Sequence, residues 1–272
     1  MIRVKDFGPV STQRHPLAVV EALSEMTGVE MSRTTIGNHP IVCLVAVEGS
    51  NEEEKIVNAF ARLGLPLPTA TIREVWGWDE LDQLPFLCFF APSGPEFGGN
   101  EYGRVYEPAP GGCKECSRDR TQVADLILKL PAGFKKEVSM SFDWELIVSA
   151  RVRSEIEDAG LRGMSFRSIR NRKGGIIADF WQLTPGALMP PLSAASWEVE
   201  GVCPGCGRDN IYLRSPMRYR AEELPVDVDF ARMAEQLGRD GGRYNFVSKR
   251  AYRILKKYAK KRENWQGILL VD

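Results

Sequence analysis

Residues 111–116 read Gly-Gly-Cys-Lys-Glu-Cys, and residues 202–208 read Val-Cys-Pro-Gly-Cys-Gly-Arg. Each stretch holds a CxxC pair, whose two thiolates can both bind one tetrahedral metal ion. Two such pairs complete the four-sulfur shell of a closed structural zinc site. Gly205 and Gly207 favour the second pair as a metal knuckle, because glycine adopts the positive φ angles of a tight turn. We therefore expect structural Zn²⁺ bound by Cys113, Cys116, Cys203 and Cys206.

Two other interpretations of the pairs stay open. Residues 117–202 separate them, whereas a compact zinc ribbon has about 15 to 20 residues between its pairs, so the two can also be unrelated. A redox disulfide within one pair is the second alternative, but neither pair opens a helix after a strand as a thioredoxin-like motif does. The other cysteines, Cys43 and Cys88, lie singly in apolar runs and are expected to be small buried hydrophobic residues.

The pattern of apolar residues predicts an α+β protein with two domains. Residues 1–95 are expected to form a small N-terminal α+β domain. Within it, residues 40–47 are typical of a buried strand and residues 51–63 of an amphipathic helix. Ser50 is the expected N-cap of that helix, and Glu53 completes a capping box.

Residues 96–272 are expected to form a second α+β domain, stapled by the split zinc-ribbon-like site. Within it, residues 144–166 and 244–270 follow one pattern. In each segment a short strand ends at Val-Ser, the serine starts a helix, and a glycine leads into a second strand. Because the two segments share few identities, the pattern indicates either an internal strand-helix-strand repeat or a chance similarity.

The two CxxC motifs and the sequence ELIVSARVRSEIEDAGLRGMSF at residues 145–166 resemble the bacterial double-CxxCG motif family. The Val-Ser helix unit is also similar to immunity proteins of polymorphic toxin systems. The similarity covers residues 101–272, and it departs from the family at Ser117, which follows Cys116 where the family has glycine. The resemblance implies a cytosolic metal-binding protein without catalytic activity, which binds a partner protein and neutralises a cognate toxin.

Composition disfavours several classes of protein. Lys and Arg together number 36, as do Asp and Glu, so the chain as a whole has no net field that steers it toward nucleic acid. Its apolar runs are shorter than the ~20 residues of a membrane span, and the first residues lack a signal peptide's apolar segment, so a cytoplasmic location is expected. The chain has two histidines, His15 and His39, and no phosphate-binding loop or nucleophile motif, so no enzyme activity is expected.

Residues 243–262 carry nine basic residues and no acidic one. On a helix from Lys249, Tyr252 and Leu255 would line one side and the basic residues much of the rest. Such a stripe suits the phosphates of a nucleic acid or an acidic protein surface, and a solvated helix is the third interpretation. We expect a protein partner, with nucleic acid as the alternative. The candidate binding residues are Lys249, Arg250, Arg253, Lys256, Lys257, Lys260 and Lys261.

Overall fold

A computed structural model describes most of the chain. The described residues are 2–11, 31–36, 39–65, 70–92, 105–116, 118–141, 144–213, 216–238 and 241–271, with the single residues 25, 28, 67 and 94. The chain divides into two compact units, Met1–Gly77 and Trp78–Asp272. This division precedes the boundary expected at residue 95, because strand β5 (Phe86–Phe89) pairs with strands from the C-terminal part of the chain.

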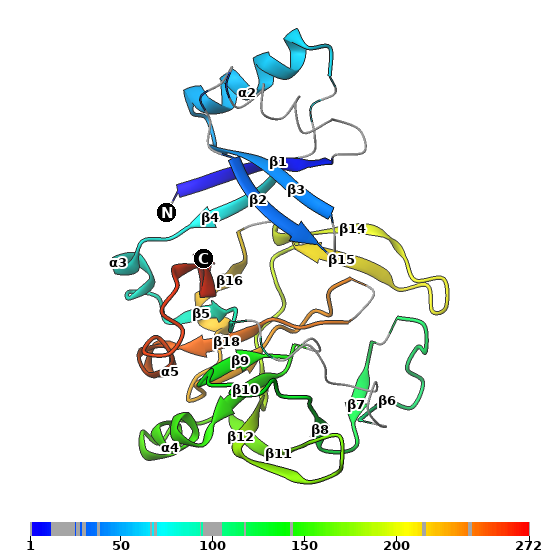
Figure 1. Cartoon of the computed structure of the whole chain (residues 1–272), viewed down its shortest axis with the longest axis vertical. Helices are drawn as coiled ribbons and strands as arrows, with labels where there is room; N and C mark the ends of the chain where they lie inside the picture. Colours follow the sequence, from blue (N-terminus) through cyan, green and yellow to red (C-terminus); the bar gives the residue numbers. More distant parts are fainter. Residues whose placement is uncertain are drawn as a thin grey trace. The chain divides into compact units, whose positions relative to one another are not determined.

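The N-terminal unit contains an antiparallel sheet in the order β2-β3-β1-β4. Helix α2 (Asn51–Arg62) follows β3 along the chain and contacts it (Figure 1). The strand expected at residues 40–47 is β3. The bounds of the four strands are β1 (Ile2–Ser11), β2 (Met31–Ile36), β3 (His39–Val47) and β4 (Ala70–Val75).

Helix α2 begins where its capping residues predict. The hydroxyl of Ser50 accepts a hydrogen bond from the Glu53 N–H at 3.3 Å. The Glu53 carboxylate accepts one from the Gly49 N–H at 2.6 Å, so the reciprocal bond of the capping box reaches one residue further back than the N-cap. The buried side of the helix consists of Ile56, Ala59 and Phe60, which keeps the spacing of one helical face.

The C-terminal unit contains two five-stranded sheets, so the molecule has the α+β fold that the sequence predicts. The first sheet has the order β8-β11-β12-β10-β9 and the second β13-β17-β18-β5-β19. The first comprises β8 (Leu126–Ile127), β9 (Val138–Met140), β10 (Leu146–Ser149), β11 (Met164–Arg170) and β12 (Ile176–Pro185). The second adds β13 (Ala187–Leu188), β17 (Phe230–Arg232), β18 (Asn245–Ser248) and β19 (Trp265–Gly267) to β5.

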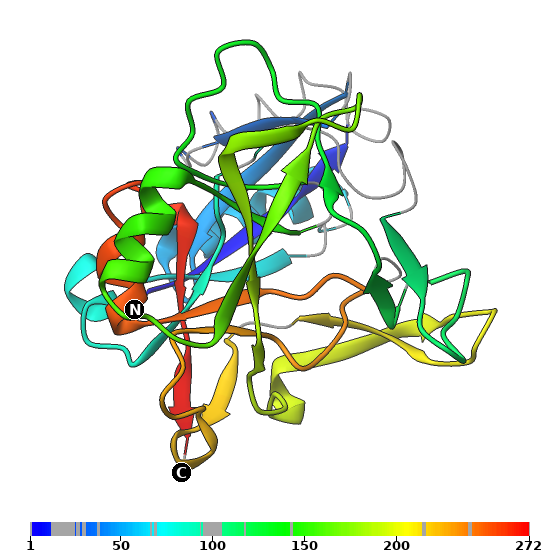
Figure 2. The same ribbon diagram turned by 90° about the horizontal axis from the view of Figure 1, so that it is seen from below.

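The two segments with a common sequence pattern have the same local structure. Helix α4 (Ala150–Asp158) connects β10 to β11, and helix α5 (Lys249–Leu255) connects β18 to β19. In each segment the two strands run parallel, because both are antiparallel to a strand that lies between them. That central strand is β12 in the first sheet, where it follows the strand-helix-strand segment along the chain. In the second sheet it is β5, which precedes that segment. The two sets of strands are therefore related by a circular permutation of their order in the chain. Helices α4 and α5 lie side by side (Figure 2).

The serines at the starts of these helices have matching bonds. Ser149 donates through its N–H to the backbone oxygen of Glu137 at 2.9 Å and through its hydroxyl to the Glu137 carboxylate. Ser248 donates through its N–H to the backbone oxygen of Asp229 at 2.9 Å and through its hydroxyl to the Asp229 carboxylate at 2.5 Å. Each acidic residue directly precedes a strand, β9 or β17. This shared geometry favours an internal repeat over chance similarity.

Smaller elements complete the C-terminal unit. The remaining strands are β6 (Tyr106–Pro108), β7 (Arg120–Gln122), β14 (Trp197–Val202), β15 (Asp209–Leu213), β16 (Arg218–Arg220) and β20 (Leu269–Val271). The remaining helices are α3 (Trp78–Leu81), η2 (Ala194–Ser196), η3 (Ala221–Glu223) and η4 (Arg262–Asn264). None of the helices in the described part of the chain has the length and apolarity needed to cross a lipid bilayer.

Candidate metal centre

The first CxxC pair lies in the loop between two short antiparallel strands, β6 and β7. The loop is closed at its base by a hydrogen bond from the Ala109 N–H to the Asp119 backbone oxygen at 2.7 Å. A second turn forms where the Gly112 N–H donates to the Ala109 backbone oxygen at 2.6 Å. These bonds hold the backbone folded back on itself, so that Cys113 and Cys116 face the same space.

The second pair lies in the turn between β14 and β15. The Cys203 N–H donates to the Arg208 backbone oxygen, and the Gly207 N–H donates to the Cys203 backbone oxygen, both at 2.8 Å. Gly207 has a φ of +70°, as the sequence predicts for a knuckle turn. Gly205 does not have a positive φ, so the reason expected for it was wrong. A side chain is disfavoured at Gly205 for a steric reason, because a Cβ there would lie only 3.1 Å from the Cys113 sulfur.

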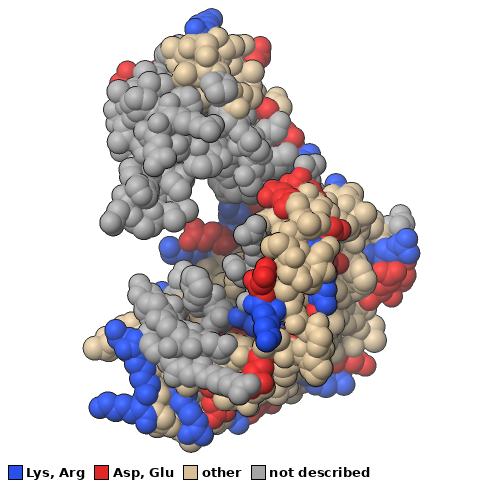
Figure 3. All heavy atoms as spheres, turned by 90° about the vertical axis from the view of Figure 1, so that its right-hand side faces the viewer, with Lys and Arg blue, Asp and Glu red and all other residues tan. Residues whose placement is uncertain are grey.

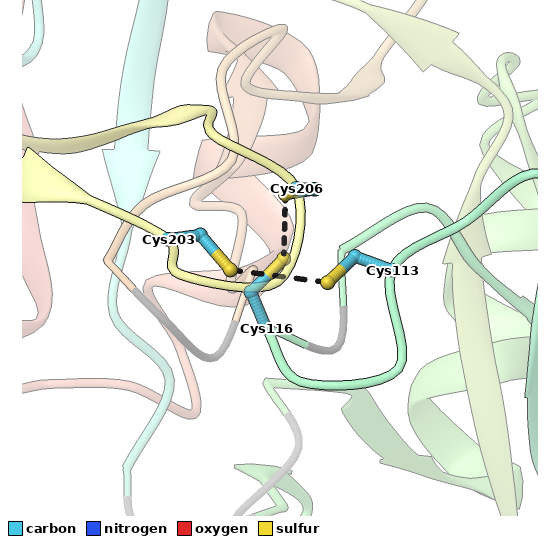
Figure 4. A group of neighbouring side chains, drawn as sticks. All are labelled: Cys113, Cys116, Cys203 and Cys206. Atoms are coloured by element: carbon cyan, nitrogen blue, oxygen red, sulfur yellow. Dashed lines mark hydrogen bonds between the residues drawn. The ribbon is translucent and has the colours of Figure 1, made fainter.

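The four sulfur atoms come together in one cluster (Figure 4). All lie within 4.8 Å of one another, and the Cys113–Cys203 and Cys116–Cys206 sulfur pairs are each 3.8 Å apart. A tetrahedron with metal–sulfur bonds of ~2.3 Å has sulfurs about 3.8 Å apart. A disulfide needs ~2.05 Å, so the arrangement fits a shared metal ion and not a disulfide. The four cysteines can therefore hold one metal ion.

Local hydrogen bonds and burial act in opposite directions on the two thiols of the first knuckle. The backbone N–H groups of Cys116 and Glu115 lower the pKa of the Cys113 thiol to about 7. Burial raises the pKa of the Cys116 thiol to about 11. Four thiolates within 4.8 Å of one another would repel each other, so the fully deprotonated cluster is unfavourable without a cation. A bound cation reverses this cost, because metal coordination removes the proton from a thiol.

Charged residues brace the two knuckles against each other. Arg118, which is buried, donates to the side-chain oxygen of Asn210 at 2.8 Å and to the Gly238 backbone oxygen at 2.9 Å. Arg208 forms an ion pair with Asp119 from the other knuckle. The sequence pattern alone did not single out Arg118, Asp119 or Asn210 as part of the site. Their signal was the presence of an arginine or aspartate just after each CxxC pair, where a side chain can reach the partner loop.

Of the other two cysteines, the structure describes the side chain of Cys88 alone, and that thiol is not in this cluster. Cys88 lies in β5 and is completely buried, as expected for a small hydrophobic residue. Burial raises the pKa of its thiol well above the ordinary value, so it is a poor thiolate donor. Cys43 lies in β3, but its side chain is outside the described part of the structure, as is all of His15.

The basic C-terminal segment is shorter as a helix than the sequence suggested. Helix α5 ends at Leu255, and it buries Tyr252 and Leu255 as predicted. Several of its candidate binding residues are paired with carboxylates of this chain. The ion pairs are Arg250–Asp229 at 3.5 Å, Lys256–Asp82 at 3.0 Å, Lys257–Glu155 at 3.0 Å and Lys261–Glu263 at 3.3 Å. Arg253 and Lys260 are exposed, and Lys249 is half-buried. The stripe is therefore partly neutralised.

Comparison of the sequence with protein-family models gives no match, and comparison with curated proteins gives none either. The four sulfur positions and the loops that hold them are what indicates a metal ion in this chain. Those loops belong to the same compact unit, which brings together cysteines that are 90 residues apart in sequence.

Proposed function

We propose that the four cysteines bind Zn²⁺ as a structural ion and that the protein is not a catalyst. The spacing of the sulfurs supports zinc, which prefers tetrahedral thiolate sites with bonds of ~2.3 Å. A fourth thiolate occupies the coordination position that catalytic zinc keeps for water or substrate. The ion would then stiffen the two knuckles and contribute directly to the stability of the C-terminal unit.

The role that we propose for this stabilised unit is binding of another protein in the cytoplasm, with neutralisation of a cognate bacterial toxin as its specific form. The β14–β15 hairpin supports partner binding, because it presents apolar side chains beside the metal cluster. Val199, Val202 and Tyr212 are 44%, 55% and 38% exposed. Exposed apolar groups on a rigid support are typical of protein interfaces. The toxin role is supported by the resemblance to immunity proteins.

The test is purification of the tagged protein from its host after nuclease treatment, followed by mass spectrometry. We expect one stoichiometric partner protein that is retained at raised salt. A variant with Val199→Glu and Val202→Glu should lose it, because two charges would have to be buried at the interface. Val226→Glu is the matched control, since Val226 is 84% exposed and lies outside the hairpin. Co-expression with the captured protein then measures whether growth is restored.

Partner binding is contradicted if no protein is retained, or if Val226→Glu removes it as effectively as the hairpin variant. The alternative to a protein partner is binding of nucleic acid by the basic C-terminal segment. Its support is weaker, because carboxylates pair with four of the seven candidate residues. On the face shown in Figure 3, basic and acidic side chains lie next to one another at several places, and basic side chains also gather at its lower left. Binding to phosphates would weaken steeply as salt is raised, which the same purification measures.

A further inference from the structure

A polar cavity of about 380 Å³ lies in the C-terminal unit, away from the four sulfurs. It is lined by both five-stranded sheets and by the β6–β7 hairpin. Four arginines reach its wall from separate elements: Arg120 of β7, Arg167 of β11, Arg232 of β17 and Arg243 just before β18. We call this cavity the arginine pocket. Its volume lies within the range of about 300 to 1,000 Å³ that is usual for small-molecule sites.

One of the four arginines is neutralised within the protein. Glu145, which is 5% exposed, accepts hydrogen bonds from Arg232 at 2.5 Å, from the Tyr106 hydroxyl at 3.0 Å and from the Gln182 amide at 2.9 Å. The carboxylate thus has a donor on both oxygens. Glu145 is the one acidic residue among the described residues that line the pocket. Arg167 and Arg243 donate to backbone oxygens, which carry no net charge, so the lining keeps an excess of positive charge.

Arg243 shows that this excess has an energetic cost. Its guanidinium donates to the backbone oxygens of Met233 and Ala234, which are neutral acceptors. Burial, followed by the nearby positive charge of Arg232, lowers the pKa of Arg243, although the carboxylates of Asp119 and Glu235 oppose this shift. Like charges held together away from water are unfavourable unless an anion compensates them. A ligand with an oxyanion group would supply this compensation.

The pocket also holds a hydroxyl without a partner. The Thr184 side-chain oxygen is buried and has no hydrogen-bond partner among the described residues. Thr184 lies on β12 and lines the same pocket. A buried hydroxyl of this kind destabilises the protein when it is left unpaired. The unpaired hydroxyl is therefore a second indication, independent of the arginine charges, that a polar group of a ligand completes the site.

The backbone at the pocket wall is strained in one place. Trp144 has a φ of +67°, in the left-handed region that bulky residues rarely adopt. Its indole packs against Gly242, where a Cβ would lie 3.2 Å from the indole nitrogen. Strain of this kind persists where the surroundings fix the residue, and it is concentrated at functional sites. Here it places an aromatic side chain in the wall of a pocket rich in arginines.

We propose that the arginine pocket binds a small phosphate- or carboxylate-bearing molecule, whose oxyanion is held by Arg120, Arg167 and Arg243 and by the Thr184 hydroxyl. The fork of a guanidinium matches both kinds of oxyanion in a bidentate way. This ligand site is separate from the metal cluster, and it is a property beyond the proposed binding of a partner protein.

The test is isothermal titration calorimetry of the metal-loaded, full-length protein with inorganic pyrophosphate, citrate and neutral adenosine at physiological salt. We expect one site per chain for pyrophosphate or citrate and none for adenosine. Arg167→Gln should weaken binding roughly ten- to hundredfold, because a charge-assisted hydrogen bond is lost. Arg220→Gln is the control, since Arg220 is exposed, pairs with Glu223 and lies outside the pocket.

Thr184→Val separates a binding role from a structural one. The variant removes the unpaired hydroxyl but nearly keeps its shape, so its melting temperature should rise while anion binding weakens roughly three- to tenfold. A structural role alone would leave the affinity unchanged. The proposal is overturned if neither anion binds at about millimolar concentration, or if Arg220→Gln weakens binding as much as Arg167→Gln. A folded Thr184→Val variant with unchanged affinity also contradicts the place of Thr184 in the site.

Discussion

Cys203→Ser is expected to release the metal ion and to lower the free energy of unfolding of the C-terminal unit by about 4 kcal/mol or more. Cys203 is 2% exposed and lies 3.8 Å from the Cys113 sulfur, so its thiolate belongs to the interior of the cluster. A serine hydroxyl stays protonated at neutral pH and is a poor zinc ligand. Without the ion, the three remaining thiols lose their compensating charge, and the two knuckles are then joined by the polar contacts of Arg118 and Arg208.

The measurements are metal content by mass spectrometry and the melting temperature of the purified variant. Cys88→Ala is the matched control, because it also removes one buried thiol but lies outside the cluster. It should retain one metal ion per chain while losing some core stability. If Cys203→Ser keeps its metal and its melting temperature, the shared site is wrong. The variant also tests the arginine pocket, because the β6–β7 hairpin carries both a knuckle and part of the pocket wall.

Asp229→Ala is expected to cost about 2 to 4 kcal/mol of stability, although Asp229 is not near the metal. Its carboxylate is 3% exposed and accepts from the Ser248 hydroxyl at 2.5 Å and from the Arg162 N–H at 2.9 Å. Alanine would leave both donors without this acceptor in the interior. It would also leave Arg250 without the carboxylate that lies 3.5 Å away. Chemical denaturation at neutral pH measures the loss.

The matching segment of the first sheet supplies the control for this prediction. Glu137 occupies the equivalent position in the first sheet and accepts from the Ser149 hydroxyl, but it is only half-buried. Glu137→Ala should therefore cost about 1 kcal/mol or less, because water can replace the lost carboxylate. Equal losses in the two variants would contradict the argument that burial sets the difference.

Local sequence patterns predicted the metal ligands and the helix starts. A CxxC knuckle and a serine N-cap are each decided by a few consecutive residues, so Cys203, Cys206, Ser50 and Ser248 could be assigned without knowledge of the fold. The proximity of the two CxxC pairs was a hypothesis that depended on the fold. The sulfur positions in the C-terminal unit now support it.

The pocket could not be predicted in the same way. Its lining includes arginines from three different sheets, namely Arg120, Arg167 and Arg232. Each of these arginines, taken alone in the sequence, is typical of a solvated surface. The positive φ of Trp144 has no sequence signal, because the residue type disfavours it. The ion pairs of the basic stripe could not be predicted for a related reason, since its partners Asp82 and Glu155 lie far from it in sequence.

The origin of the central strands has a consequence for the nascent chain. The first sheet draws all its strands from residues 126–185, so it can form while the rest of the protein is still being made. The second sheet cannot, because β5 must await β18 and β19. At about 5 to 20 residues per second, this apolar strand waits roughly ten to thirty seconds on the ribosome. During that interval its unpaired edges are the part of the chain most exposed to aggregation, and the place where a chaperone would be most useful.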